Sequence, residues 1–165
     1  MDNKRIFPSL VCGFGAAVLV TVPGIKSLGC CLIVPFAVVL SLTLDHRINK
    51  VPPPVTIKKA VFFGFLTGAF TTLFATFFEV IVTYFTKTNE FIQVLPQIEG
   101  TINQYNLSAI FKDTIALYHQ MALQITTNGF SFLYTIMIFF SYGIIYTIFG
   151  ILGGLIGMVI LNKRT

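Results

Sequence analysis

The residues best suited to chemistry in this chain are one glutamate and a row of threonines in the same apolar stretch. Glu79 lies inside the run at residues 60–86, together with Thr72, Thr76 and Thr83. At 100° per residue these four side chains share one side of a helix. An ionisable group inside a membrane span is a candidate site for ion or proton relay, or an anchor to a second protein.

A purely structural role for Glu79 is the competing interpretation. A protonated Glu79 would then hydrogen-bond to a threonine hydroxyl or a backbone carbonyl between packed helices. A charge at the centre of a span costs about 2.5–3.5 kcal/mol, and each Phe or Leu returns about 0.3–0.6 kcal/mol, so this Phe-rich run still inserts. No Lys, Arg or His lies within another predicted span to pair with Glu79, so packing or partner anchoring is favoured over transport chemistry.

The other reactive side chains predict no catalytic residues, no metal site and no cofactor. Cys12 lies in the first apolar run, and Cys30 and Cys31 are adjacent at the start of the second. Adjacent cysteines rarely ligate one metal well, and CxxC and HExxH motifs are absent from the sequence. His46 and His119 fall on opposite faces of the predicted topology. Glycine-rich phosphate loops and Ser/His/Asp sets are also lacking.

Composition places these residues in a membrane protein. Hydrophobic residues make up 55% of the chain and charged residues 10%, with 18 Phe and a mean hydropathy of +0.85. A span needs roughly 20 apolar residues to cross a hydrocarbon core of about 30 Å. Four apolar runs without strand-like alternation predict an all-α integral membrane protein with four transmembrane helices, at about residues 7–23, 28–44, 60–86 and 130–161. Pro35 is expected to bend the second.

The basic residues predict the orientation of these spans, because cytoplasmic loops retain Lys and Arg. Four spans put eight of the eleven on one side, namely Lys4, Arg5, Arg47, Lys50, Lys58, Lys59, Lys163 and Arg164. Lys26, Lys87 and Lys112 fall on the other side. Both termini are therefore predicted to be cytoplasmic, with a tight turn at Pro23 and Gly24. The net charge of +5 is explained by orientation, so no nucleic-acid partner is predicted.

Small residues predict how the third and fourth spans pack. Without a hydrophobic drive between helices in lipid, close van der Waals contact and short hydrogen bonds must hold them. The third span has Gly64 and Gly68 on its threonine side, and the fourth has Gly143, Gly150, Gly154 and Gly157 in a row. We expect the two rows to meet, with homodimerisation through the glycines as the alternative. The opposite side of the third span is expected to face lipid with Phe63, Phe70, Phe74, Phe77, Phe78 and Phe85.

The polar segment at residues 87–128 predicts a helical insert between the third and fourth spans. Pro96 and Gly100 are expected to interrupt it. From Leu107 onward the sequence indicates an amphipathic helix that lies on the lipid surface, caps the bundle or docks a partner. Its apolar side is predicted to hold Ile110, Phe111, Ile115, Tyr118, Ala122 and Ile125.

The order of these features resembles small bacterial four-helix membrane proteins of unknown function, frequent in Bacteroidota and relatives. The resemblance is carried by a helical hairpin, by Lys58-Lys59-Ala-Val-Phe-Phe-Gly64, by the helical insert and by the Gly153-Gly-Leu-Ile-Gly run near the end of the chain. It implies the architecture and a bacterial inner membrane, and it brings no catalytic residues.

Taken together, residues 1–165 are predicted to form one membrane domain without enzymatic activity. We expect an accessory or scaffold subunit of a larger membrane assembly, whose partners are the lipid bilayer and other membrane subunits or further copies of the chain. The alternative is a small oligomeric transporter or pore that uses Glu79 and the threonine-lined helix face.

Overall fold

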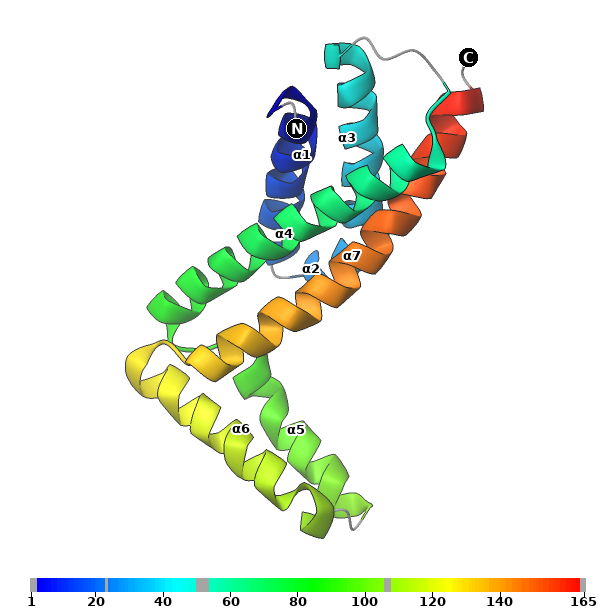
Figure 1. The fold of residues 1–165 in the computed structure, drawn as a ribbon. Coiled ribbons are helices and arrows are strands. Elements are labelled where there is room, and N and C mark those ends of the chain that lie inside the picture. The colour runs from blue at the N-terminus through cyan, green and yellow to red at the C-terminus, as the bar shows by residue number, and fades with distance from the viewer. Residues whose placement is uncertain (1–2, 23, 50–53, 106–107, 164–165) are drawn as a thin grey trace. The chain divides into compact units, whose positions relative to one another are not determined.

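The computed structural model describes residues 3–22, 24–49, 54–105 and 108–163, and this part of the chain is helical without strands (Figure 1). The predicted all-α class is confirmed. Pro23, Lys50 and Arg164, used above for the turn and the charge distribution, lie outside the described residues. The elements are α1 (Asn3–Thr21), α2 (Lys26–Leu28), the π-helical turn η1 (Gly29–Ile33), α3 (Val34–Asn49), α4 (Ile57–Thr86), α5 (Glu90–Gln104), α6 (Ser108–Asn128) and α7 (Phe132–Lys163).

Three helical segments among the described residues are long and apolar enough to cross a membrane: Gly29–Asn49, Ile57–Thr86 and Phe132–Lys163. The apolar part of α1, Ile6–Thr21, is a shorter helix. At 1.5 Å per residue, the 30 residues of α4 span about 45 Å and the 32 residues of α7 about 48 Å. Both helices are therefore longer than a hydrocarbon core of about 30 Å.

The second predicted span begins with an irregular turn just before its proline. The amide of Val34 donates to the carbonyl of Gly29, which is the i to i+5 spacing of a π-helix. Pro35, the second residue of α3, has no N–H to continue the ladder. The wider turn and the proline thus occur together, at the place where the sequence predicts a bend.

Backbone contacts divide the chain into two compact units, residues 1–78 with 138–165 and residues 79–137, whereas the sequence predicts one domain. In the first unit, α1 and α3 lie together at Ser9 and Ser41, whose buried hydroxyls are 3.1 Å apart. Two apolar clusters fill this unit. One contains Ala17, Val20, Val34, Ala75 and Tyr146, and the other Val38, Leu42, Val55, Ala60 and Phe63.

Glycines bring α4 and α7 together in this unit, side by side in Figure 1. A Cβ placed on Gly64 would lie 2.5 Å from the carbonyl oxygen of Gly150, and one on Gly68 would lie 2.6 Å from that of Tyr146. A Cβ on Gly154 would collide with the carbonyl of Ala60. The helices therefore approach so closely that side chains larger than hydrogen are excluded at these positions.

The two remaining glycines of the predicted row have different surroundings. Only Thr72 comes within 4 Å of a Cβ placed on Gly143, at 3.8 Å. Gly157 faces α3, where Leu42 Cδ1 would be 3.0 Å away, and Gly153 lies against Pro35 of the same helix. Two residues that are three positions apart in a helix point in directions about 60° apart. Consequently α7 uses one glycine pair against α4 and a neighbouring pair against α3.

The second unit contains a helical hairpin joined to the ends of α4 and α7. Phe91 of α5 contacts the rings of Tyr118 and Tyr134, with centroids 5.4 Å and 5.7 Å apart. Leu95, Met121 and Ile125 of this unit are also buried. The chain enters and leaves the hairpin through residues of positive φ, Lys87 at 53° and Gly129 at 74°. Lys87 Nζ donates to the carbonyl of Thr127 at 3.3 Å, and a Cβ on Gly129 would lie 2.6 Å from the carbonyl of Tyr84.

The insert differs from the prediction in one respect. Pro96 and Gly100 do not interrupt α5, which runs through both after an N-cap in which Asn89 Oδ1 accepts from the Ile92 amide at 3.0 Å. In α6, Ile125 of the predicted apolar side is buried, whereas Ile110 and Phe111 of the same side are exposed. The buried core of this unit gathers around the last turns of α6, so that its first turns remain uncovered.

Candidate functional site

The predicted polar residues of α4 are divided between the two units. Thr72 and Thr76 are buried in the first unit. The Thr72 hydroxyl donates to the carbonyl of Gly68 at 2.9 Å, whereas the Thr76 hydroxyl has no hydrogen-bond partner among the described residues. In the second unit, Glu79 is half-buried and Thr83 is buried with no partner for its hydroxyl among those residues.

Two further threonines of α4, which the sequence analysis did not single out, are buried more completely. Thr67 and Thr71 are fully covered, and the Thr71 hydroxyl donates to the Thr67 carbonyl at 2.8 Å. A Cβ placed on Gly13 of α1 would lie 3.1 Å from that same carbonyl and 2.7 Å from Phe70 Cβ. Two sides of α4 are therefore covered, one by α1 near Thr67 and the other by α7 at Gly64 and Gly68.

The expectation that the phenylalanines of α4 all face lipid is wrong. Phe63 is only 2% exposed and belongs to the apolar cluster around Leu42. Phe74 and Phe78 make edge contacts with Phe14 of α1, with ring centroids 5.3 Å and 5.8 Å apart. Phe63 is thus covered by α3, and Phe74 and Phe78 are covered by α1. A division of α4 into one packed side and one lipid side does not anticipate these contacts. Phe77 and Phe85 are exposed as expected.

An ion pair between the buried Asp45 of α3 and the half-buried Lys59 of α4 is not among the features predicted from the sequence. Asp45, whose side chain is 1% exposed, lies 2.5 Å from Lys59 Nζ. Asn49 donates to the other carboxylate oxygen at 2.6 Å, and the Lys59 ammonium also lies 5.7 Å from the centre of the Phe63 ring. Asp45 directly follows one predicted apolar run and Lys59 directly precedes the next. Opposite charges at these two run ends are the sequence feature that could have indicated the pair.

A second polar contact ties the same ends of the helices together. The side-chain amide of Asn162 in α7 accepts from the backbone N–H of Val55 at 2.8 Å and donates to the Val55 carbonyl at 3.2 Å. One side-chain carboxamide, which has both a donor and an acceptor, thus satisfies both backbone groups of Val55. Because Val55 and Lys59 flank the start of α4, this end of the first unit is held by both contacts.

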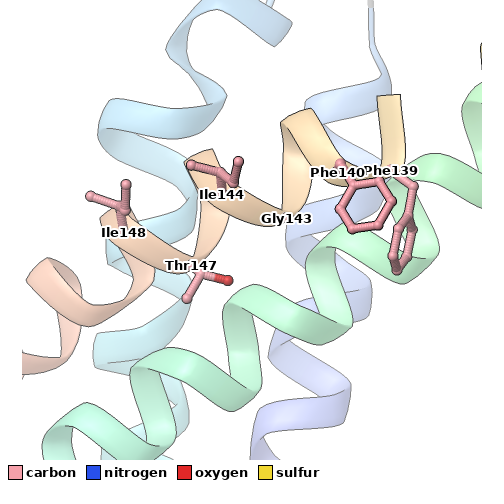
Figure 2. A pocket seen from close by; sticks show the side chains of 6 residues that line it. All are labelled: Phe139, Phe140, Gly143, Ile144, Thr147 and Ile148. Atoms are coloured by element: carbon pink, nitrogen blue, oxygen red, sulfur yellow. The ribbon is translucent and has the colours of Figure 1, made fainter. Parts of the chain in front are cut away.

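An apolar groove runs along one side of α7 (Figure 2). Its volume is about 390 Å³, and its lining comes from a single helix: Phe139, Phe140, Gly143, Ile144, Thr147 and Ile148. Because Gly143 has no side chain, the groove stays open between the two phenylalanines on one side and the two isoleucines on the other (Figure 2). The groove offers no cluster of charged or nucleophilic side chains, and its surface suits an acyl chain or an apolar helix.

The residue types that commonly bind metals are His, Cys, Asp and Glu. Within the described ranges, no group of three or more His, Cys, Asp or Glu side chains comes together. His119 lies in the second unit, where its Nε2 is 2.7 Å from a Glu99 carboxylate oxygen. His46 lies in the first unit on α3. Cys30 and Cys31 are neighbours, with their sulfur atoms 3.5 Å apart.

No known protein family, curated protein or solved structure matches this chain.

Proposed function

We propose that this chain is a non-enzymatic bacterial inner-membrane protein that serves as an accessory or scaffold subunit of a larger membrane assembly. In this proposal α1 is a fourth span beside the three long apolar helices, and both termini lie in the cytoplasm. The single observation that carries the subunit role is the exposure of large apolar side chains on α6. This helix is not among those long and apolar enough to cross a membrane, yet Ile110 is 75% and Leu123 64% exposed.

Covering such side chains would stabilise an assembly. Burying one large apolar side chain is worth about 1.5–3 kcal/mol relative to leaving it in water. Exposed apolar surface on an element outside the hydrocarbon therefore favours a protein partner or the lipid interface. The orientation is supported by the exposed cations Arg47, Lys58 and Lys163, which lie at the end of the first unit tied by Asp45 and Asn162. Cytoplasmic ends of spans carry such an excess of positive charge.

Purification in mild detergent from the native membrane, followed by mass spectrometry, tests the subunit role. We expect foreign membrane subunits in stoichiometric amounts with the wild type, and their loss from an Ile110→Asn/Leu123→Asn variant. The matched control is Thr114→Asn/Gln120→Asn, which changes two exposed polar positions of the same helix and should retain the partners. A lone, homogeneous oligomer of this chain would contradict the proposal.

A small oligomeric pore or transporter is the second candidate, favoured by the buried hydroxyls of Thr67 and Thr76, which lack partners within the described part of the chain. Against it, Thr71 and Thr72 bond to carbonyls of their own helix, and α1 packs near Thr71 while α7 packs near Thr72. Flux measured in liposomes with the wild type and with Glu79→Gln distinguishes the two functions. Equal flux in both proteins removes Glu79 from any transport mechanism.

A further inference from the structure

Cys30 and Cys31 form a pair of thiols in direct contact, at the start of the second long apolar segment. Their sulfur atoms are 3.5 Å apart, and within this pair Cys31 is exposed whereas Cys30 is half-buried. Cys30 packs against the cluster that contains Ala17, Val20 and Val34. One sulfur is thus held by the packed interior while its neighbour is open to a reagent.

The backbone around these cysteines is unusual for adjacent residues. In a regular α-helix, side chains at neighbouring positions diverge and do not face one another. Both cysteines belong to the π-helical turn Gly29–Ile33, and such turns occur frequently at functional sites. The turn is fixed against α1, since a Cβ placed on Gly29 would lie 2.6 Å from Val20 Cγ1. The contact between the sulfurs is therefore built on a packed part of the first unit.

The geometry suits a shared ligand better than a disulfide. Adjacent Cα atoms are about 3.8 Å apart, below the separation of about 4.4–6.8 Å that disulfides use. Bond lengths of about 2.3 Å from each sulfur to a bound ion, together with the 3.5 Å separation, correspond to an angle of roughly 100° at that ion. A linear two-coordinate ion would instead need sulfurs about twice the bond length apart.

We propose that Cys30 and Cys31 form a chelating dithiol site for a thiophilic ion that binds two thiolates at a bent angle, with trivalent arsenic as the type case. Trivalent arsenic forms pyramidal complexes whose sulfur–arsenic–sulfur angle is close to a right angle. With an aryl arsenoxide, two arsenic–sulfur bonds form, the arsenic–oxygen bond breaks, and the two thiol protons leave with the oxygen as water. The step involves no oxidation or reduction. The sequence predicts no metal site because adjacent cysteines rarely ligate one metal well, but in this π-helical turn the two sulfurs lie 3.5 Å apart.

Phenylarsine oxide is a membrane-permeant probe for this site. The full chain, reduced and carrying Cys12→Ser so that only the pair remains, is treated in nanodiscs with one equivalent of reagent. We expect an intact-mass increase of one phenylarsenic group and loss of both thiols from maleimide labelling. The adduct should resist an excess of the monothiol 2-mercaptoethanol and be removed by the dithiol dithiothreitol.

Two variants in the same background separate chelation from ordinary thiol reactivity. Cys31→Ser keeps one thiol, and its adduct should be removed by 2-mercaptoethanol. Cys31→Ser/Phe36→Cys keeps two thiols but places the second at an exposed position of α3, and it should behave like two single thiols. The proposal is overturned if the wild-type pair loses arsenic to the monothiol as readily as the separated pair, or if it labels with two maleimides after arsenical treatment.

Discussion

Gly64 and Gly150 lie with their backbones in mutual contact: a Cβ on either residue would come within 2.5 Å of the other's carbonyl oxygen. Because both obstacles are backbone atoms, neither can rotate away as a side chain would. The separation of α4 and α7 is set at this point by the absence of side chains.

Gly150→Ala should therefore destabilise the first unit. Forcing a methyl group into a packed site typically costs about 1–3 kcal/mol, and thermal unfolding in detergent, followed by circular dichroism, measures the loss. Gly15→Ala is the matched control, because nothing lies within 4 Å of a Cβ at Gly15 in α1. Alanine is favoured over glycine in a helix by about 1 kcal/mol, so the control should be unchanged or more stable. Equal stability of the two variants would refute this account of the packing.

Gly129→Ala should destabilise the second unit through two effects. The residue has a φ of 74°, and its Cβ would meet the Tyr84 carbonyl at 2.6 Å. Gly24 has a φ of 87° but open space around it, so Gly24→Ala carries only the conformational cost of about 1 kcal/mol. We expect the unfolding midpoint to fall further for Gly129→Ala, measured under the same conditions. Identical shifts would show that the contact with Tyr84 contributes nothing.

The Asp45–Lys59 pair should show strong coupling in a double-mutant cycle. Lys59→Met leaves a buried carboxylate without its cation, a change that costs about 3–5 kcal/mol for buried pairs. Asp45→Asn/Lys59→Met removes both charges and should recover much of that loss. Chemical denaturation of the four proteins provides the coupling free energy. Additive losses from the two single changes would mean that the charges do not interact.

Asn162 should protect the backbone of Val55 from exchange with solvent. Asn162→Ala removes both hydrogen bonds, and Asn162→Asp retains an acceptor for the Val55 N–H while losing the donor to its carbonyl. Amide hydrogen exchange at Val55 should accelerate strongly in the alanine variant and only weakly in the aspartate variant. A loss of about 1–2 kcal/mol in stability is expected for the alanine variant. Unchanged exchange in both proteins would contradict the assigned role.

The long helices and the close glycine contacts were accessible from the sequence, because both follow from short-range rules. Apolar length predicts the segments around α4 and α7, and helical spacing puts Gly64 and Gly68 on one side. Which helix each glycine meets depends on tertiary packing, so the orientation of Gly157 toward α3 was not predicted. The burial of Phe63 was missed for the same reason, since α3 covers it.

The polar sites were less predictable, since they depend on contacts between segments distant in sequence. Asp45 and Lys59 are each at the edge of an apolar run, and only folding brings their charges together. Asn162 and Val55 are 107 residues apart. Local irregularity also limited the prediction: a helical projection assumes 100° per residue, and the π-helical turn at residues 29–33 departs from it.

The residues where the chain departs from and returns to the long helices are in direct contact, at Tyr84 with Gly129 and at Lys87 with Thr127. Segments with adjoining ends can be exchanged, lengthened or excised without pulling their anchor points apart. The hairpin of α5 and α6 is thus an insertion whose two ends lie next to each other. An unrelated hairpin of the same end spacing could therefore take its place without changing the contacts at Tyr84 and Lys87.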